Sequence, residues 1–272
     1  MTEVSVVFVG LARDCEVSAA AFVEALAGLS AQGGRVSAVI GENGSTDRTR
    51  EILTRSPLVR VVDTGAMTDA GPRLRRMAVG RQLLQKAVAN EPANLVAVID
   101  IDERFLDDVT LEQIDDAAAR LATGEVYAVG ATSRPAYYDL LAYRGPEGDF
   151  AGLDRRIDEQ RRRPLRYYRL FREEIYPAQR RLTRHEDMMC RSSFNGLAFY
   201  RAEDFRLGSY LSEAYDECEH VPFHASLASA TGRGAMVIAG TLILRMPREH
   251  GPRGVFGFFW QRIVRQTKQR FL

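Results

Sequence analysis

Residues 95–102 read Leu-Val-Ala-Val-Ile-Asp-Ile-Asp, a short apolar run that ends in two aspartates. Five consecutive apolar residues are typical of a strand buried on both faces, as in a parallel sheet covered by helices. Side chains alternate along a strand, so we expect Asp100 and Asp102 to project together while Ile101 faces away. Ligands of open parallel sheets bind beyond the carboxyl ends of the strands. Two carboxylates there predict a divalent cation that holds a diphosphate, as in a sugar-nucleotide site.

An acid after a strand can instead cap the next helix. Here the next helix has a cap of its own, because Thr110 and Gln113 fit a capping box that leads into an apolar stripe. Asp100 and Asp102 are therefore left for another task. Two like charges at a buried strand end repel each other unless a cation lies between them, which favours the cation site.

Strand-like and helix-like segments alternate on both sides of this run. The expected strands are residues 4–9, 36–40, 59–62 and 126–130, and the expected helices are residues 16–29, 47–53, 73–89 and 110–121. This alternation predicts βαβ units and an α/β fold with a mainly parallel, Rossmann-like sheet flanked by helices.

The second half of the chain has a different composition. Residues 134–187 are rich in arginine and tyrosine and lose periodicity, so we expect long loops and short strands over the sheet. The arginine run 161–163 is expected to be a solvated face, with a phosphate clamp as the alternative. We divide the chain into residues 1–130, residues 131–245 of the same domain, and a tail of residues 246–272.

Charge and cysteine content narrow the partners and the compartment. The 272 residues carry 37 Lys+Arg and 36 Asp+Glu, a net charge of +1 that predicts no global attraction to nucleic acid or to a membrane. Three widely spaced cysteines, with no signal peptide and no apolar run of about 18 residues, predict a cytoplasmic protein. The aromatic and basic segment 255–272 is expected either to contact the inner face of a membrane or to dock on its own domain.

The segment 41–49 (GENGSTDRT) directly follows the second expected strand. Its glycines permit a tight turn, and Ser45 or Thr46 can cap the next helix. Glu42 and Asn43 lie where they can accept hydrogen bonds from a base or a ribose. The segment is neither GxGxxG nor a P-loop, which counts against a dinucleotide or P-loop enzyme.

Arg81 falls within the apolar stripe of the expected helix 73–89. The stripe consists of Leu74, Met77, Ala78, Leu84 and Val88. An unpaired arginine on a core-facing stripe costs roughly several kcal/mol, so we expect Arg81 to pair with a site carboxylate or the diphosphate. The alternative is that its guanidinium extends to the surface.

At this point the chain resembles a known family. The first strand, the segment Gly10–Arg13, GENGSTDRT and the Asp-x-Asp pair together resemble the nucleotide-sugar domain of GT-A-fold glycosyltransferases. Three later segments, YDLLAYR at 138–144, SSFNGLAF at 192–199 and ECEH at 217–220, are similar to those of the fungal capsule α-1,3-mannosyltransferase family and its bacterial relatives. The resemblance touches most of residues 5–225.

The resemblance implies transfer of mannose from GDP-mannose to a saccharide or lipid-linked acceptor in cell-surface polysaccharide synthesis, with retention of configuration. Residues 1–130 would bind the nucleotide sugar and residues 131–245 the acceptor. Asp100 and Asp102 would hold Mn²⁺ or Mg²⁺. The other donor-side residues would be Arg13, Glu42, Asn43, Arg73 and Arg81. The acceptor-side residues would be Tyr138, Arg144 and Asn195, with an Asp139–Arg144 ion pair at the border of the pocket.

The late cluster around ECEH offers a base and a third metal ligand. Glu217, Glu219 or Asp139 would serve as the catalytic carboxylate. His224 or His220 would be the third ligand. If the segment is helical, Glu217, His220 and His224 share one face, and if it is extended, Glu217 and Glu219 do. A zinc site with Cys218 matches no strong signature, and a surface helix without chemistry is a further alternative.

Two other functions compete with transfer. A nucleotidyltransferase would need a glycine-rich, basic loop after the first strand, and Gly10–Arg13 is too poor in glycine. A non-catalytic nucleotide-sugar-binding protein would keep the fold and bind donor without turnover.

Overall fold

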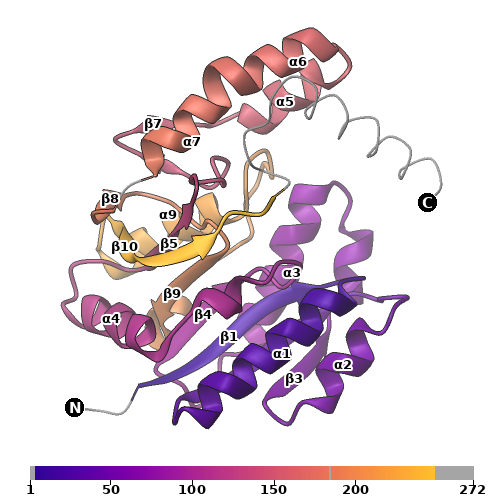
Figure 1. Ribbon diagram of the computed structural model, residues 1–272, viewed down its shortest axis with the longest axis vertical. Helices are drawn as coiled ribbons and strands as arrows, with labels where there is room; N and C mark the ends of the chain where they lie inside the picture. Colours follow the sequence, from indigo (N-terminus) through magenta and orange to yellow (C-terminus); the bar gives the residue numbers. More distant parts are fainter. Residues whose placement is uncertain (1–3, 184, 249–272) are drawn as a thin grey trace.

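The computed structural model describes residues 4–183 and 185–248, and its centre is an eight-stranded sheet (Figure 1). The strand order is β3-β2-β1-β4-β9-β5-β10-β8. The strands are β1 Ser5–Ala12, β2 Arg35–Glu42, β3 Val59–Asp63, β4 Leu95–Ile99, β5 Val129–Arg134, β8 Met188–Cys190, β9 Leu197–Arg201 and β10 Met236–Arg245. β1 to β4 are parallel, as are β5 and β10, whereas β9 runs antiparallel to β4 and β5. The predicted α/β fold with a mainly parallel sheet is confirmed.

Helices cover both faces of the sheet. One face packs against α1 Glu16–Ala31, α2 Thr49–Arg55 and α4 Leu111–Ala122. The other packs against α3 Arg73–Ala87, the short α8 Ala202–Phe205 and α9 His220–Thr231. Short 3₁₀ turns at Gly65–Ala70 and Phe105–Asp108 follow β3 and β4.

β4 lies in the middle of this sandwich, between β1 and β9. All five of its residues are buried. Val96 and Val98 belong to the core on the α3 face, and Leu95, Ala97 and Ile99 to the core on the α1 face. The apolar run therefore forms a strand buried on both faces, as predicted.

The helix that follows β4 begins with the expected capping box. The Thr110 hydroxyl accepts a hydrogen bond from the Gln113 N–H at 3.3 Å, and the Gln113 side chain accepts one from the Thr110 N–H at 2.9 Å. Because α4 has this cap of its own, the acid pair at 100 and 102 is free for other contacts, as argued from the sequence.

The expectation of loops and short strands over residues 134–187 is wrong for much of this region. The short pair β6 Arg144–Gly145 and β7 Gly148–Asp149 is present, but three helices follow: α5 Leu153–Arg161, α6 Pro164–Leu170 and α7 Tyr176–Leu182. A π-helical turn at 171–175 joins α6 to α7. Each helix is short, and α6 and α7 carry proline in the first turn, where it is tolerated. The three helices contain few apolar residues among their prolines and arginines, so the sequence shows no clear helical period of hydrophobic positions.

Strands from both predicted halves belong to the one large sheet. The proposed tail begins at residue 246, and its segment 255–272, with the expected membrane contact, lies outside the described residues. Within the described ranges, no helix is both long and apolar enough to cross a membrane.

Candidate functional site

Arg81 of α3 joins two carboxylates at the carboxyl end of β4. Its Nη2 donates to Asp100 Oδ1 at 2.8 Å, and its Nε donates to Glu219 Oε1 at 3.1 Å. Arg81 is 4% exposed and Glu219 7%, and the guanidinium also lies 5.1 Å from the centre of the Phe194 ring. The expected pairing of Arg81 with a site carboxylate is confirmed, and the alternative of a surface guanidinium is wrong.

The positive charge of Arg81 is surrounded by several carboxyl groups. Burial alone would lower the pKa of Arg81, but Asp100 and Glu219 outweigh it and raise this pKa, so the guanidinium stays charged. Burial raises the pKa of Asp100 to about 7, Arg81 opposes the rise, and the charges of Asp102 and Asp139 add to it. The site therefore holds more carboxylates than its one buried cation neutralises.

Asp102 lies beyond Asp100 and is exposed, whereas Ile101 between them is fully buried in the core. Burial, and then the charges of Asp100, Asp139 and Asp102, hold the pKa of the Tyr138 phenol well above its ordinary value. The three aspartates thus act on one phenol and belong to one region of the molecule.

The donor set suits a cation that is shared with a substrate. In the part of the chain that the structure describes, no three His, Cys, Asp or Glu side chains are grouped to hold a metal ion, so the zinc site with Cys218 is not formed. Mg²⁺ is usually bound by one or two carboxylates together with substrate phosphates. Asp100 and Asp102 fit that mode of binding.

The assignment of His224 as a metal ligand is wrong. Its Nδ1 lies 2.9 Å from Ser192 Oγ and its Nε2 lies 2.8 Å from Tyr200 Oη, so both ring nitrogens are occupied. Burial lowers the pKa of His224 to about 3. The imidazole is a neutral, hydrogen-bonded core group because α9 turns this face toward the sheet.

Arg144 does not form the expected ion pair with Asp139. Its Nη2 donates to Glu217 Oε2 at 2.8 Å, and its Nε lies 3.2 Å from Asp149 Oδ1. Arg144 is 6% exposed, so its side chain is not available to an acceptor. Because α9 begins only at His220, the helical face shared with Glu217 is not formed.

Asn195 is also wrongly assigned to acceptor contact, because its side chain is fully buried. Its Oδ1 accepts hydrogen bonds from the N–H of Tyr138 at 3.0 Å and of Asp139 at 3.3 Å. Asn195 thereby holds the turn that carries these two residues. Tyr138 stacks on Phe105, with ring centres 6.0 Å apart, and burial raises the pKa of Asp139 to about 6.

Glu42 does not face a ligand either. It is fully buried, one carboxylate oxygen accepts the Ser45 N–H, and the other pairs with Arg50. Burial would raise the pKa of Glu42, but these hydrogen bonds outweigh it and lower the pKa. Asn43 is half-buried, and its Oδ1 accepts a hydrogen bond from Thr68 at 2.9 Å.

The turn after β2 is locked to the turn after β1. Asp47 Oδ2 accepts the N–H of Glu16 at 3.0 Å, and its Oδ1 accepts the N–H of Thr49 at 2.9 Å. Thr46 N–H donates in return to Asp14 Oδ1 at 2.7 Å. The Asp47 carboxylate therefore accepts a backbone N–H at the first residue of α2, a role that was expected of Ser45 or Thr46. It also accepts the N–H of the first residue of α1. GENGSTDRT thus fixes the loops at this edge of the sheet.

Arg13 and Arg73 are the predicted donor-side arginines that remain exposed. Arg13 follows β1, next to β4 in the sheet, and its Nε lies 3.5 Å from Asp14 Oδ2. Arg73 is the first residue of α3. Sequence reasoning missed Phe105 and Phe194, the rings under Tyr138 and Arg81, because a buried aromatic residue has no linear signature.

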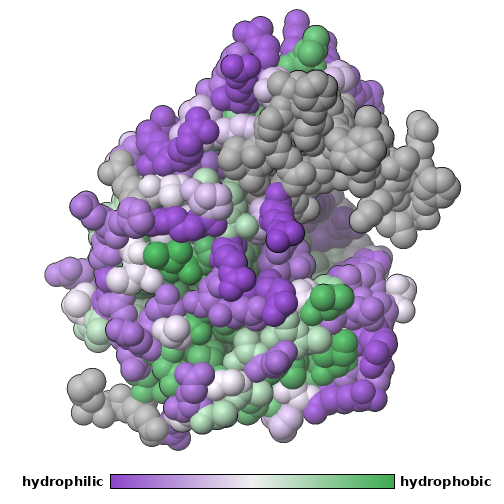
Figure 2. All heavy atoms as spheres, in the orientation of Figure 1, coloured by the Kyte–Doolittle hydropathy of each residue, from purple (hydrophilic) through white to green (hydrophobic). Residues whose placement is uncertain are grey.

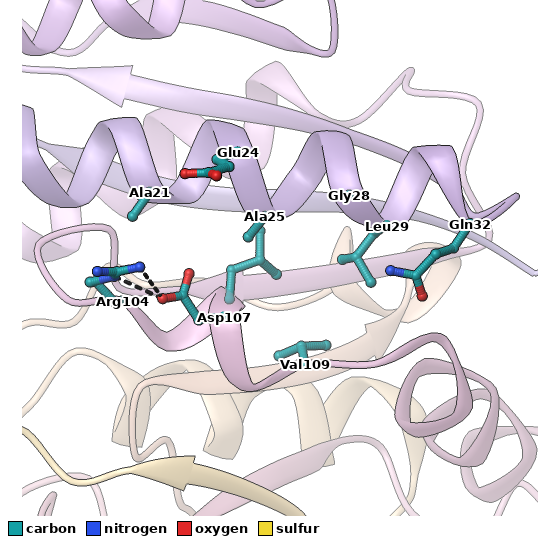
Figure 3. A pocket seen from close by; sticks show the side chains of 10 residues that line it. Ala21, Glu24, Ala25, Gly28, Leu29, Gln32, Arg104, Asp107 and Val109 are labelled. Carbon is teal, nitrogen blue, oxygen red and sulfur yellow. Dashed lines mark hydrogen bonds and ion pairs between the residues drawn. The ribbon is translucent and has the colours of Figure 1, made fainter.

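A separate cleft of about 330 Å³ lies between α1 and the segment after β4 (Figure 3). Glu24 of α1 and Gln32, the residue after this helix, line it, with the ion pair of Arg104 and Asp107 across from them at 2.7 Å. None of the predicted site residues lines this cleft.

No family model and no curated protein matches the sequence, so the capsule mannosyltransferase resemblance stays a prediction. Among solved structures, the chain is similar to mannosyl-3-phosphoglycerate synthase from Rubrobacter xylanophilus, at 16% identity over 98% of this chain and 75% of that one, with a TM-score of 0.49. It is also similar to glucosyl-3-phosphoglycerate synthase from Mycobacterium tuberculosis (18% identity, 93% and 75% of the chains, TM-score 0.47). The same enzyme in complex with Mn²⁺ and UDP-glucose gives 17% identity over 94% and 74% of the chains, and a TM-score of 0.47.

Proposed function

We propose that this protein is a metal-dependent glycosyltransferase that uses a nucleotide-diphosphate sugar. The observation that carries the proposal is the buried Arg81, which orients Asp100 at the carboxyl end of β4 while Asp102 stays exposed beyond it. Ligands of open α/β sheets bind at this edge. A cluster of carboxylates in excess of its buried cation supports a shared divalent ion and diphosphate.

Asp100 and Asp102 would hold Mn²⁺ or Mg²⁺, which when bound supplies a Lewis acid for the leaving diphosphate. Arg81 fixes Asp100 through Oδ1 and leaves Oδ2 outside that bond. Arg81 was expected to contact the donor. Because it is almost fully buried, we propose instead that it positions Asp100. Arg13 and Arg73, both exposed, are the arginines proposed to reach the donor.

On the acceptor side we place the catalytic carboxylate at Asp139. Glu219 and Glu217 are held by Arg81 and Arg144. Asp139 is half-buried beside Tyr138, and its Oδ1 accepts a long hydrogen bond of 3.4 Å from the Ala142 N–H. A carboxyl with a pKa of about 6 suits proton acceptance near neutral pH. Mannose from GDP-mannose and a saccharide or lipid-linked acceptor remain the proposed substrates, on the resemblance alone.

The test is metal-dependent hydrolysis of a panel of GDP-, UDP- and CDP-sugars by the full chain. We expect turnover with Mn²⁺, loss of turnover on chelation, and a decrease of at least about a hundredfold in Asp102→Asn. The matched control is Asp107→Asn, an exposed aspartate of the same segment that lies in the separate cleft.

Turnover that persists in chelator, or an equal loss in both variants, would contradict the proposal. Donor binding without turnover for any nucleotide sugar would favour the binding protein. Release of pyrophosphate from a nucleoside triphosphate and a sugar phosphate would favour the nucleotidyltransferase.

A further inference from the structure

The segment from the end of α5 through α6 is strongly basic. Residues 161–172 contain six arginines and no acidic residue. Residues 161–166, which form the corner between the two helices, are all exposed. This corner (residues 161–166) reads Arg-Arg-Arg-Pro-Leu-Arg, so four of its six side chains carry a positive charge.

Most of the positive charge at the corner is not neutralised by the protein itself. Arg161 pairs with Asp158 at 3.0 Å, one turn back on α5. In the described ranges of the chain, Arg162, Arg163 and Arg166 have no carboxylate within ion-pair distance. Three guanidinium groups therefore remain available to a ligand that carries several negative charges.

An apolar side chain lies among these arginines. Leu165 is 73% exposed, one of the most exposed large hydrophobic residues in the described chain. Tyr167 and Tyr168 follow it and are half-buried. The combination of cations, an apolar tip and neighbouring tyrosines is typical of segments that lie at the boundary of headgroups and acyl chains.

The corner lies at one end of the molecule. Figure 1 places α5, α6 and α7 at the top of the view, opposite α1 and α2. Figure 2 shows that the surface there is mainly hydrophilic, with a small hydrophobic patch over α6. Among the described residues, the corner is exposed at this end, where it can meet a flat surface.

We propose that this corner binds the surface of an anionic membrane, with Arg162, Arg163 and Arg166 on lipid phosphates and Leu165 inserted between headgroups. The arginines are gathered at one projecting corner and do not line a groove, which disfavours a single-stranded nucleic acid. The inference rests on exposure and charge at α5 and α6 and is independent of the proposed sugar transfer.

The experiment is sedimentation of the full chain with vesicles of equal parts phosphatidylglycerol and phosphatidylcholine. Each arginine near an anionic surface contributes roughly a factor of five, so Arg162→Gln, Arg163→Gln and Arg166→Gln together are expected to weaken partitioning about a hundredfold. The matched control replaces the exposed Arg48, Arg55 and Arg206 with glutamine and changes the net charge equally. We expect the control to bind like the wild type, and vesicles of phosphatidylcholine alone to bind neither protein.

The apolar contact has its own test. Leu165→Ser is expected to weaken partitioning about tenfold, whereas Val17→Ser, which removes another exposed hydrophobic side chain, is expected to have no effect. Circular dichroism checks that each variant is folded. Equal vesicle binding by the corner and control variants would overturn the proposal. It would also be overturned if the corner arginines were required for binding an oligonucleotide and the wild type did not bind vesicles.

Discussion

Arg81 brings Asp100, from the end of β4, and Glu219, from the segment before α9, into one buried network. Removal of the guanidinium would leave two carboxylates without their cation. We therefore expect Arg81→Leu to lower the free energy of unfolding by about 3–5 kcal/mol, measured by urea denaturation at neutral pH. Arg73→Leu, on the same helix but exposed, is expected to change it by less than about 0.5 kcal/mol.

A double variant separates the charge effect from lost packing. Arg81→Met combined with Glu219→Gln removes one cation and one anion, and we expect it to be more stable than Arg81→Leu. If both variants lose equal stability, the loss comes from packing against Phe194 and the ion-pair argument fails.

His224 predicts how the stability of the fold depends on pH. Its pKa is lowered from 6.5 to about 3 by burial, so between these values the unfolded chain binds a proton that the folded chain does not. The contribution of His224 to the free energy of unfolding therefore falls as the pH is lowered below about 6.5. Burial also lowers the pKa of His220, which adds to the same slope. Asp100 and Asp139, whose pKa values are raised by burial, contribute in the opposite direction over part of this range, so the histidine is read from the difference between the wild type and a variant.

The measurement is the free energy of unfolding by urea at a series of pH values through this window. One such histidine contributes up to about 1.4 kcal/mol per pH unit. We expect His224→Gln, which has no titrating imidazole, to show a slope shallower by up to this amount. Parallel slopes for the wild type and the variant would show that the histidine is not a buried neutral group.

At the scale of elements, short local signals decide where helices begin. The capping box of α4 follows from Thr110 and Gln113 alone, and Gln113 Nε2 also donates to the Thr241 carbonyl of β10 at 2.9 Å. We expect Thr110→Ala to cost about 1 kcal/mol of unfolding free energy, measured by thermal or urea denaturation. Thr54→Ala removes an exposed hydroxyl that bonds only within α2 and is expected to be near neutral. An equal loss of unfolding free energy in Thr110→Ala and Thr54→Ala would contradict the stabilising role of the capping box.

The GENGSTDRT turn, unlike the cap of α4, depends on contacts with a segment distant in the sequence. Its glycines and polar residues predicted a tight turn after β2, but not that Asp47 and Asp14 would tie it to the turn after β1. Hydrogen bonds between two loops depend on the pairing of β1 with β2, which brings their carboxyl ends together. The segment therefore contributes to the site indirectly, because it holds the loops after β1 and β2 together at the carboxyl edge of the sheet.

At the scale of the whole molecule, β9 connects the two predicted halves. It pairs antiparallel with β4 on one side and β5 on the other, so the first half alone would leave β4 as an uncovered edge. We expect residues 1–130 expressed alone to show no cooperative thermal transition by circular dichroism, whereas the full chain shows one. A cooperative transition of the fragment would mean that the two halves fold independently.

Local pattern alone predicted the frame that carries the site. The apolar run of β4, the stripe of α3 and the cap of α4 each depend on residues within one element, and all three appear where expected. The interior position of Arg81 followed from the same stripe, because a charged residue on a core-facing position requires a partner. Asp100 and Asp102 were expected to project together by strand alternation, but β4 ends at Ile99, so the common direction of the two side chains stays a prediction.

The tertiary structure alone decided which polar side chains are buried and satisfied. Glu42, Arg144, Asn195 and His224 look like site residues in the sequence, and each has its partners inside the protein. A buried polar group is stable only when a partner is supplied, and here most of those partners come from distant segments. Spacing along the chain carries no record of such contacts, so the sequence determined the sheet and its acidic edge, and the packed structure determined which polar residues remain for chemistry.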